Sequence, residues 1–180
     1  LLQGVPNNAF TEGFAFVFQG RDLKVLGMEN ENENAAALEA LDSFWQTREI
    51  AGVALVDIRT WHWMYDHPEA TPAQLRQAVI DIAKKVWNEF YAPVFGVSDS
   101  PVLAVYSHMI AYPLYLAHYP LGLIVANQIE NYFETHELGE HMQRMCVQGD
   151  ILPDTWMKGA VGEKISTRPM IDAAGRAADA

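Results

Sequence analysis

The first candidate for chemistry is Glu12, a carboxylate that lies in the sequence among four phenylalanines. These are Phe10, Phe14, Phe16 and Phe18. A carboxylate in apolar surroundings is costly to desolvate unless a cation meets it. Neither Lys nor Arg lies within a helical turn of Glu12 in the sequence, so we take a metal ion as the sharpest candidate for that cation.

A second interpretation of Glu12 stays open on the residues alone. Asn7 or Asn8 can cap a helix that begins just before this position. In the first turn of a helix a carboxylate is stabilised by the helix dipole and accepts hydrogen bonds from backbone N–H groups. Under that interpretation Glu12 needs no ligand.

The second candidate is a cluster of imidazoles and phenols in the middle of the chain, broken by Pro113 and Pro120. It consists of Tyr106, His108, Tyr112, Tyr115, His118 and Tyr119. Tyrosines at such spacing can simply pack in a core, with their hydroxyl groups at the wet edge. The alternative is a bent, substrate-facing segment whose side chains donate hydrogen bonds to a reacting carbonyl. The two prolines, which expose backbone between the polar aromatic residues, favour the second interpretation.

A third pattern, from His136 to His141, looks like the zinc signature H-E-x-x-H but has the wrong spacing. The signature needs histidines four residues apart, so that both project from one face of a helix. Here Glu140 occupies the fourth position and His141 the fifth. The spacing therefore predicts a polar helix end or turn. The E-x-x-H spacing of ferritin-like di-iron sites does not occur anywhere in the sequence.

Composition excludes several classes of protein. The net charge of −11 and the pI of about 4.8 argue against nucleic acid or an anionic membrane surface as a partner. The sequence has no run of 18 apolar residues that could span a bilayer. Cys146 is the single cysteine, which excludes an intrachain disulfide and a cysteine-based zinc cluster.

Hydrophobic periodicity and local start and stop signals predict an all-α fold. Thr71-Pro72 and the segment 98–101 (S-D-S-P) are start signals, and Gly27 and Gly162 are stop signals. The sequence predicts that Pro113 and Pro120 interrupt the helical segments around them. We expect helices over about residues 8–26, 35–65, 72–91, up to 134 after Pro120, 138–148, 153–160 and 169–178.

Residues 5–12 (V-P-N-N-A-F-T-E), followed by an aromatic helix, carry a resemblance to a known family. They resemble the segment that follows H-E-x-x-H in the thimet oligopeptidase and oligoendopeptidase F family of zinc metallopeptidases. In that family a glutamate on the second active-site helix is the third zinc ligand. The resemblance places Glu12 at that position and implies zinc as the cofactor.

Two further segments are similar to the same family. Residues 108–122 resemble its downstream substrate loop, which carries a histidine followed by spaced tyrosines. The resemblance implies that His108 contacts the substrate, with His118 as a second substrate-binding residue. It also implies that Tyr112, Tyr115 or Tyr119 stabilises the oxyanion. The ending, from Gly162 through 166–169 (S-T-R-P) into an Ala-rich helix, is similar to the family's C-terminal finish.

The resemblance implies that residues 1–180 are the C-terminal part of one helical catalytic domain, whose H-E-x-x-H segment lies upstream. The start at Leu-Leu-Gln also suggests a piece of a longer protein. We therefore expect a zinc peptidase acting on peptides, inactive as this chain alone. Segments such as 121–125 are apolar on most sides, so we expect the missing N-terminal part or a second copy of the chain to cover them. Two alternatives are a non-catalytic helical scaffold and a pseudo-peptidase whose zinc motif has decayed.

Overall fold

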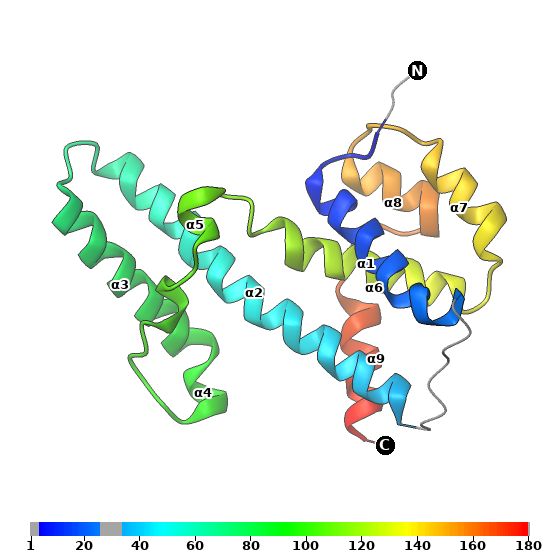
Figure 1. The fold of residues 1–180 in the computed structure, drawn as a ribbon, viewed down its shortest axis with the longest axis horizontal. Helices are drawn as coiled ribbons and strands as arrows, with labels where there is room; N and C mark the ends of the chain where they lie inside the picture. Colours follow the sequence, from blue (N-terminus) through cyan, green and yellow to red (C-terminus); the bar gives the residue numbers. More distant parts are fainter. Residues whose placement is uncertain (1–3, 26–33, 180) are drawn as a thin grey trace. The chain divides into compact units, whose positions relative to one another are not determined.

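A computed structural model describes residues 4–25 and 34–179, which form helices and turns without a strand (Figure 1). The all-α prediction is confirmed, and the longer helices begin and end close to the predicted positions. The predicted stop at Gly27 and the connection at 28–33 lie outside the described residues. The elements in chain order are α1 (Asn8–Val25), α2 (Ala35–Asp66), α3 (Pro72–Phe90), α4 (Ala92–Phe95), the 3₁₀ turn η1 (Val102–Ala104), α5 (His108–Ala111), α6 (His118–Phe133), α7 (Leu138–Cys146), α8 (Pro153–Val161) and α9 (Arg168–Ala178).

The chain divides into two compact units. The first combines Leu1–Thr47 with His118–Ala180, and the second is Arg48–Ala117. Helix α2 contributes its N-terminal part to the first unit and the rest to the second. The segments that carry the candidate chemistry are therefore described within the unit to which each belongs.

Several helix ends follow from local signals that the sequence made visible. The Asn7 side chain accepts a hydrogen bond from the Ala9 N–H at 2.9 Å and caps α1. Thr71 and Gln74 form a reciprocal capping box at the start of α3. Gly162 ends α8 with φ at +86°, a left-handed conformation in which a side chain would be strained.

Two expected features are different in the structure. The start signal at 98–101 is followed only by the three-residue turn η1, because Asp99 is used in another way. Its backbone N–H and carboxylate pair with the Asn88 side chain at 2.8 Å and 2.9 Å, which holds the loop on α3. Pro120 does not interrupt a helix, since it lies buried in the first turn of α6. A proline is tolerated there because its missing N–H has no helical partner to lose.

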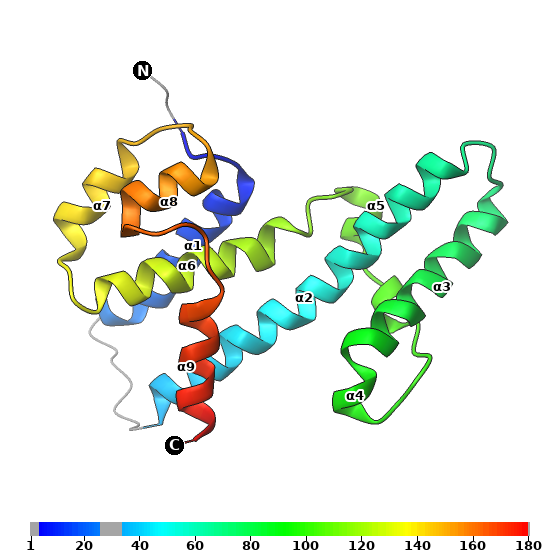
Figure 2. The same cartoon turned by 180° about the vertical axis from the view of Figure 1, so that it is seen from behind.

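The core of the first unit forms where α1 runs parallel to α6 and α8 closes over one side (Figure 2). Trp156 is fully buried at the centre of this core, and its ring meets Phe10 at 5.0 Å and Phe14 at 5.7 Å edge to face. Arg21 and Glu130 form a two-point ion pair, with contacts of 2.5 Å and 3.1 Å, further along both helices. The two helices therefore keep one register along their length.

The second unit is built on the antiparallel pair of α2 and α3. Tyr91, just after α3, lies directly on Gly52 of α2, where an added Cβ would collide with the Tyr91 hydroxyl. That hydroxyl donates a hydrogen bond to the Arg48 carbonyl, and burial raises the pKa of Tyr91. Arg59 and Glu89 bridge the same two helices at 3.3 Å.

None of the helices over the described residues combines the length and the apolar character that a membrane span needs.

The capping box of α3 yields a first testable prediction. Thr71→Ala removes the side-chain acceptor for the Gln74 N–H, so we expect the free energy of unfolding to fall by about 1 kcal/mol. Urea denaturation followed by circular dichroism measures it. Thr167 is the matched control, because it caps α9 without a side-chain hydrogen bond. An equal loss in Thr71→Ala and Thr167→Ala would show that the box contributes nothing.

Candidate functional site

The site begins with a close crossing of two helices that only glycine allows. A Cβ at Gly122 of α6 would lie 2.8 Å from Glu12 Cβ, 2.9 Å from the Ala9 carbonyl oxygen and 3.0 Å from the Gly13 nitrogen. From the other side, a Cβ at Gly13 would lie 3.1 Å from the Gly122 carbonyl oxygen. The backbones of α1 and α6 therefore lie too close for a Cβ at position 122, and Glu12 lies at that contact.

Glu12 lies at the helix crossing, beyond the first turn of its helix. The first turn of α1 contains no acidic residue, and Glu12 lies beyond it. The interpretation of Glu12 as a residue of the first helical turn is therefore wrong. Its side chain is half-buried. The four phenylalanines do not enclose it evenly, since Phe10 is buried while Phe18 is 51% exposed.

His118 and Tyr119 lie in the first turn of α6, one turn before the contact of Gly122 with Glu12. They precede Gly122 by four and three residues, so all three positions share one face of the helix. Both side chains are half-buried. The N-terminal half of α6 thus carries an imidazole and a phenol on the helix face that contains Gly122, the residue that contacts Glu12 of α1.

The other predicted site residues lie in the second unit, in the segment around α5. The His108 ring lies 5.6 Å from the Tyr112 ring and 5.3 Å from the Tyr106 ring, centre to centre. Tyr112 is 61% exposed. Tyr115 is half-buried, and its N–H bonds to the Tyr112 carbonyl at 3.1 Å. Tyr106, which belonged to the sequence cluster but was not assigned a role, is part of this ring group.

A buried carboxylate, Asp57, supports this segment and was missed by the sequence analysis. Asp57 is 2% exposed, and its Oδ2 accepts a hydrogen bond from the Leu114 N–H at 2.7 Å. Burial raises the pKa of the Asp57 carboxyl, and the hydrogen bonds from Leu114 and Trp61 offset only part of that effect. A signal was present in the sequence, because Asp57 interrupts the apolar run 53–58 (V-A-L-V-D-I).

The segment that imitates H-E-x-x-H is a turn followed by the start of α7, as its spacing predicted. His136 stacks on Tyr132 at 3.8 Å, and His141 Nδ1 lies 3.1 Å from the Tyr132 hydroxyl. Arg144 donates to the carbonyls of Gly159 and Ala160 near the end of α8. These contacts tie α7 to its neighbours, and both histidines have structural partners.

Metal-binding capacity over the described ranges is limited to partial sites. Within 4–25 and 34–179, His, Cys, Asp and Glu side chains do not form a group of three that could hold a metal ion. Among the described residues, Glu12 is therefore not part of a three-ligand group. A complete zinc site requires three protein ligands.

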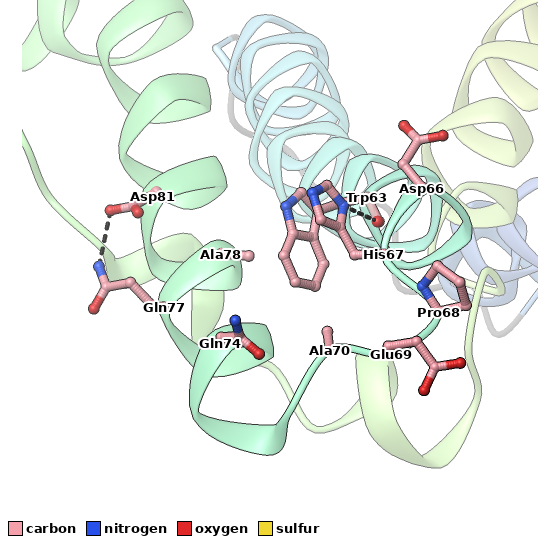
Figure 3. A pocket seen from close by; sticks show the side chains of 10 residues that line it. All are labelled: Trp63, Asp66, His67, Pro68, Glu69, Ala70, Gln74, Gln77, Ala78 and Asp81. Carbon is pink, nitrogen blue, oxygen red and sulfur yellow. Dashed lines mark hydrogen bonds between the residues drawn. The ribbon is translucent and has the colours of Figure 1, made fainter.

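A pocket of about 670 Å³ lies at the turn between α2 and α3, and its lining does not include any of the predicted site residues (Figure 3). Trp63 and His67 stack at 4.2 Å on its wall. The carboxylates of Asp66 and Glu69 point outward, and Asp81 is bonded to Gln77 at 3.0 Å. The His67 ring nitrogen likewise bonds to the Trp63 carbonyl at 2.8 Å.

The helix crossing yields a second prediction. Gly122→Ala places a methyl group against the backbone of α1, and we expect it to lower the free energy of unfolding by about 1–3 kcal/mol. Gly139→Ala in α7 is the control, because its added Cβ would meet nothing within 4 Å. That control should be neutral or stabilising by about 0.5–1 kcal/mol. Thermal unfolding of both variants measures the difference, and equal stabilities would refute the close crossing.

Asp57 yields a prediction about pH. Since its folded-state pKa is above the ordinary value, the folded protein binds more protons between the two pKa values, and the free energy of unfolding falls as pH rises through that window. Asp57→Asn removes this titration. We expect the stability of Asp57→Asn relative to the wild type to increase from about pH 4 upward and then to level off. Urea denaturation from acid to neutral pH tests it, with Asp150→Asn, an exposed position, as control. A relative stability that falls with pH would contradict the assignment.

Comparisons with protein-family models, with curated proteins and with solved structures gave no match to this chain. The resemblance of residues 5–12 and 108–122 to a peptidase family therefore remains a prediction, and the function is argued from the geometry above.

Proposed function

We propose that this chain is the C-terminal part of the catalytic domain of a zinc metallopeptidase similar to the thimet oligopeptidase and oligoendopeptidase F family. The observation that carries the proposal is the placement of Glu12. It is half-buried against Gly122, at the end of α6 where His118 and Tyr119 lie. A carboxylate is a ligand type that zinc accepts, and the helix packing fixes the backbone position of this one.

Zinc fits the described residues only in part. Glu12 fits one ligand position, and the resemblance implies that two histidines of an H-E-x-x-H segment elsewhere in the protein supply the others. When bound, the metal would activate a water and polarise the scissile carbonyl. The residues of this chain would bind and orient the peptide.

The role of the imidazoles and phenols is electrostatic. Hydrogen-bond donors that face the oxygen on which negative charge develops stabilise the transition state, and removal of one such donor costs about 10²–10³-fold in rate. On the resemblance, Tyr112, Tyr115 or Tyr119 is the donor proposed for this role. His108 in the second unit and His118 in the first are the residues proposed to contact the substrate.

The segment around α5 also offers apolar surface to a peptide. Val105 is 81% exposed and Ile110 is 88% exposed, on either side of His108. Exposed apolar side chains beside polar aromatic residues are typical of surfaces that bind a peptide or another protein segment. Such surface is also available to the rest of the protein or to a second copy of the chain.

The test is zinc binding by the full-length protein with Glu12→Gln. Loss of a partner that only orients a metal ligand already weakens binding by about 10–100-fold, so we expect loss of a ligand to weaken zinc binding by about 10²-fold or more. Peptidase activity should fall with the zinc content. Metal analysis after equilibration against a zinc buffer measures the first effect, and cleavage of a fluorogenic peptide the second.

Glu137→Gln is the matched control, because Glu137 is an exposed glutamate in the segment that imitates H-E-x-x-H. It should retain zinc and activity. The purified 180-residue chain, which supplies one ligand, is the inactive control. If Glu12→Gln keeps its zinc, Glu12 is not a ligand, and a full-length protein without zinc supports a helical scaffold or a pseudo-peptidase.

A further inference from the structure

The segment that carries His108 and Tyr112 ends in a turn whose backbone is strained. Leu114 has φ at +63°, in the left-handed region that side chains other than glycine rarely adopt. It follows Pro113, whose ring fixes its own φ and removes a backbone donor. Such a conformation persists only where contacts with the surrounding structure stabilise it.

The contact that holds it comes from α2. Asp57 Oδ2 accepts the Leu114 N–H at 2.7 Å, and Asp57 is 2% exposed although Leu114 itself is 41% exposed. A hydrogen bond to a buried carboxylate is shorter and stronger than one between neutral groups. The Trp61 side chain donates a second hydrogen bond to the same carboxylate. Asp57 is thus fixed on a rigid helix and binds the exposed turn at its strained residue.

The turn at Leu114 limits the positions of the aromatic and imidazole rings that precede it in the sequence. The Tyr112 N–H bonds to the His108 carbonyl at 2.8 Å, and the Tyr115 N–H bonds to the Tyr112 carbonyl at 3.1 Å. Tyr106, His108 and Tyr112 form a chain of ring contacts between 5.3 Å and 5.6 Å. With α5 only four residues long, these local bonds do not by themselves fix the segment on the second unit.

We propose that Asp57 is a positioning residue, which anchors the segment 106–115 through the Leu114 N–H and so holds His108 and Tyr112 for contact with a peptide. The contact of His108 and Tyr112 with a substrate rests on the proposed function. The anchor, which is the hydrogen bond between the Leu114 N–H and Asp57, does not depend on it. Asp57 acts through Leu114 and has no contact of its own with substrate.

Limited proteolysis of this chain tests the anchor. Chymotrypsin can cleave after Tyr106 and Leu114, and the cleavage rate follows the population of the opened segment. Asp57→Leu removes the acceptor, and we expect about tenfold faster cleavage within 106–115 with unchanged helix content. Asp57→Asn retains an acceptor oxygen of the same shape, and its rate should stay within about threefold of the wild type. Equal rates in all three proteins would overturn the proposal.

Hydrogen exchange in the wild type gives a test that does not depend on a variant folding. The Leu114 amide should exchange about 10²-fold more slowly than a free peptide amide, although its side chain is exposed. Leu114→Gly is a further control, because glycine relieves the backbone strain and retains the N–H; it should remain protected. A Leu114 amide that exchanges at the free rate would overturn the anchor.

The substrate part is tested in the full-length protein. Asp57→Leu should lower kcat/KM for a peptide about tenfold, and Asp57→Asn should restore most of it. An unchanged kcat/KM in Asp57→Leu would overturn the positioning role. If the wild type itself lacks peptidase activity, the proposed function fails and the substrate part fails with it, whereas the Leu114 exchange and proteolysis results decide the anchor separately.

Discussion

The first unit depends on one steric constraint, the contact of α1 and α6 at two glycines. Gly13 and Gly122 let the two backbones meet where any side chain would separate them. The same contact places Glu12 against the start of α6, and the Arg21–Glu130 ion pair keeps the helices in register further along. Fully buried Trp156 then packs its ring against α1. The position of the candidate ligand is thus a consequence of helix packing and does not require a dedicated loop.

Much of the fold could be predicted because its signals are local. The Thr71-Pro72 start, the Asn7 cap and the stop at Gly162 depend on backbone groups within a few residues, which the sequence displays directly. The signal at 98–101 failed for a different reason. Asp99 has a partner on α3, Asn88, which no local pattern reveals. Pro120 was misplaced because a proline in the first turn of a helix and a proline between helices look alike in sequence.

The candidate site was predicted in part. Glu12 stood out through its neighbours, although the phenylalanines around it are buried unevenly and the helix crossing gives the better reason for its position. The ring group of His108 and Tyr112 followed from the density of aromatic residues. Asp57 was missed because its partner, the Leu114 N–H, is 57 positions away in the sequence. Backbone partners at such separation are set by tertiary structure. The sequence signal for Asp57 was a lone carboxylate within an apolar run.

The proposed chemistry depends on whether a divalent ion meets the Glu12 carboxylate. The most direct measurement is anomalous diffraction at the zinc absorption edge from crystals of the full-length protein. The account predicts a peak about 2.0–2.2 Å from a Glu12 carboxylate oxygen, with two imidazole nitrogens at a similar distance. A zinc peak elsewhere in the protein, with the Glu12 carboxylate surrounded only by water, would contradict it.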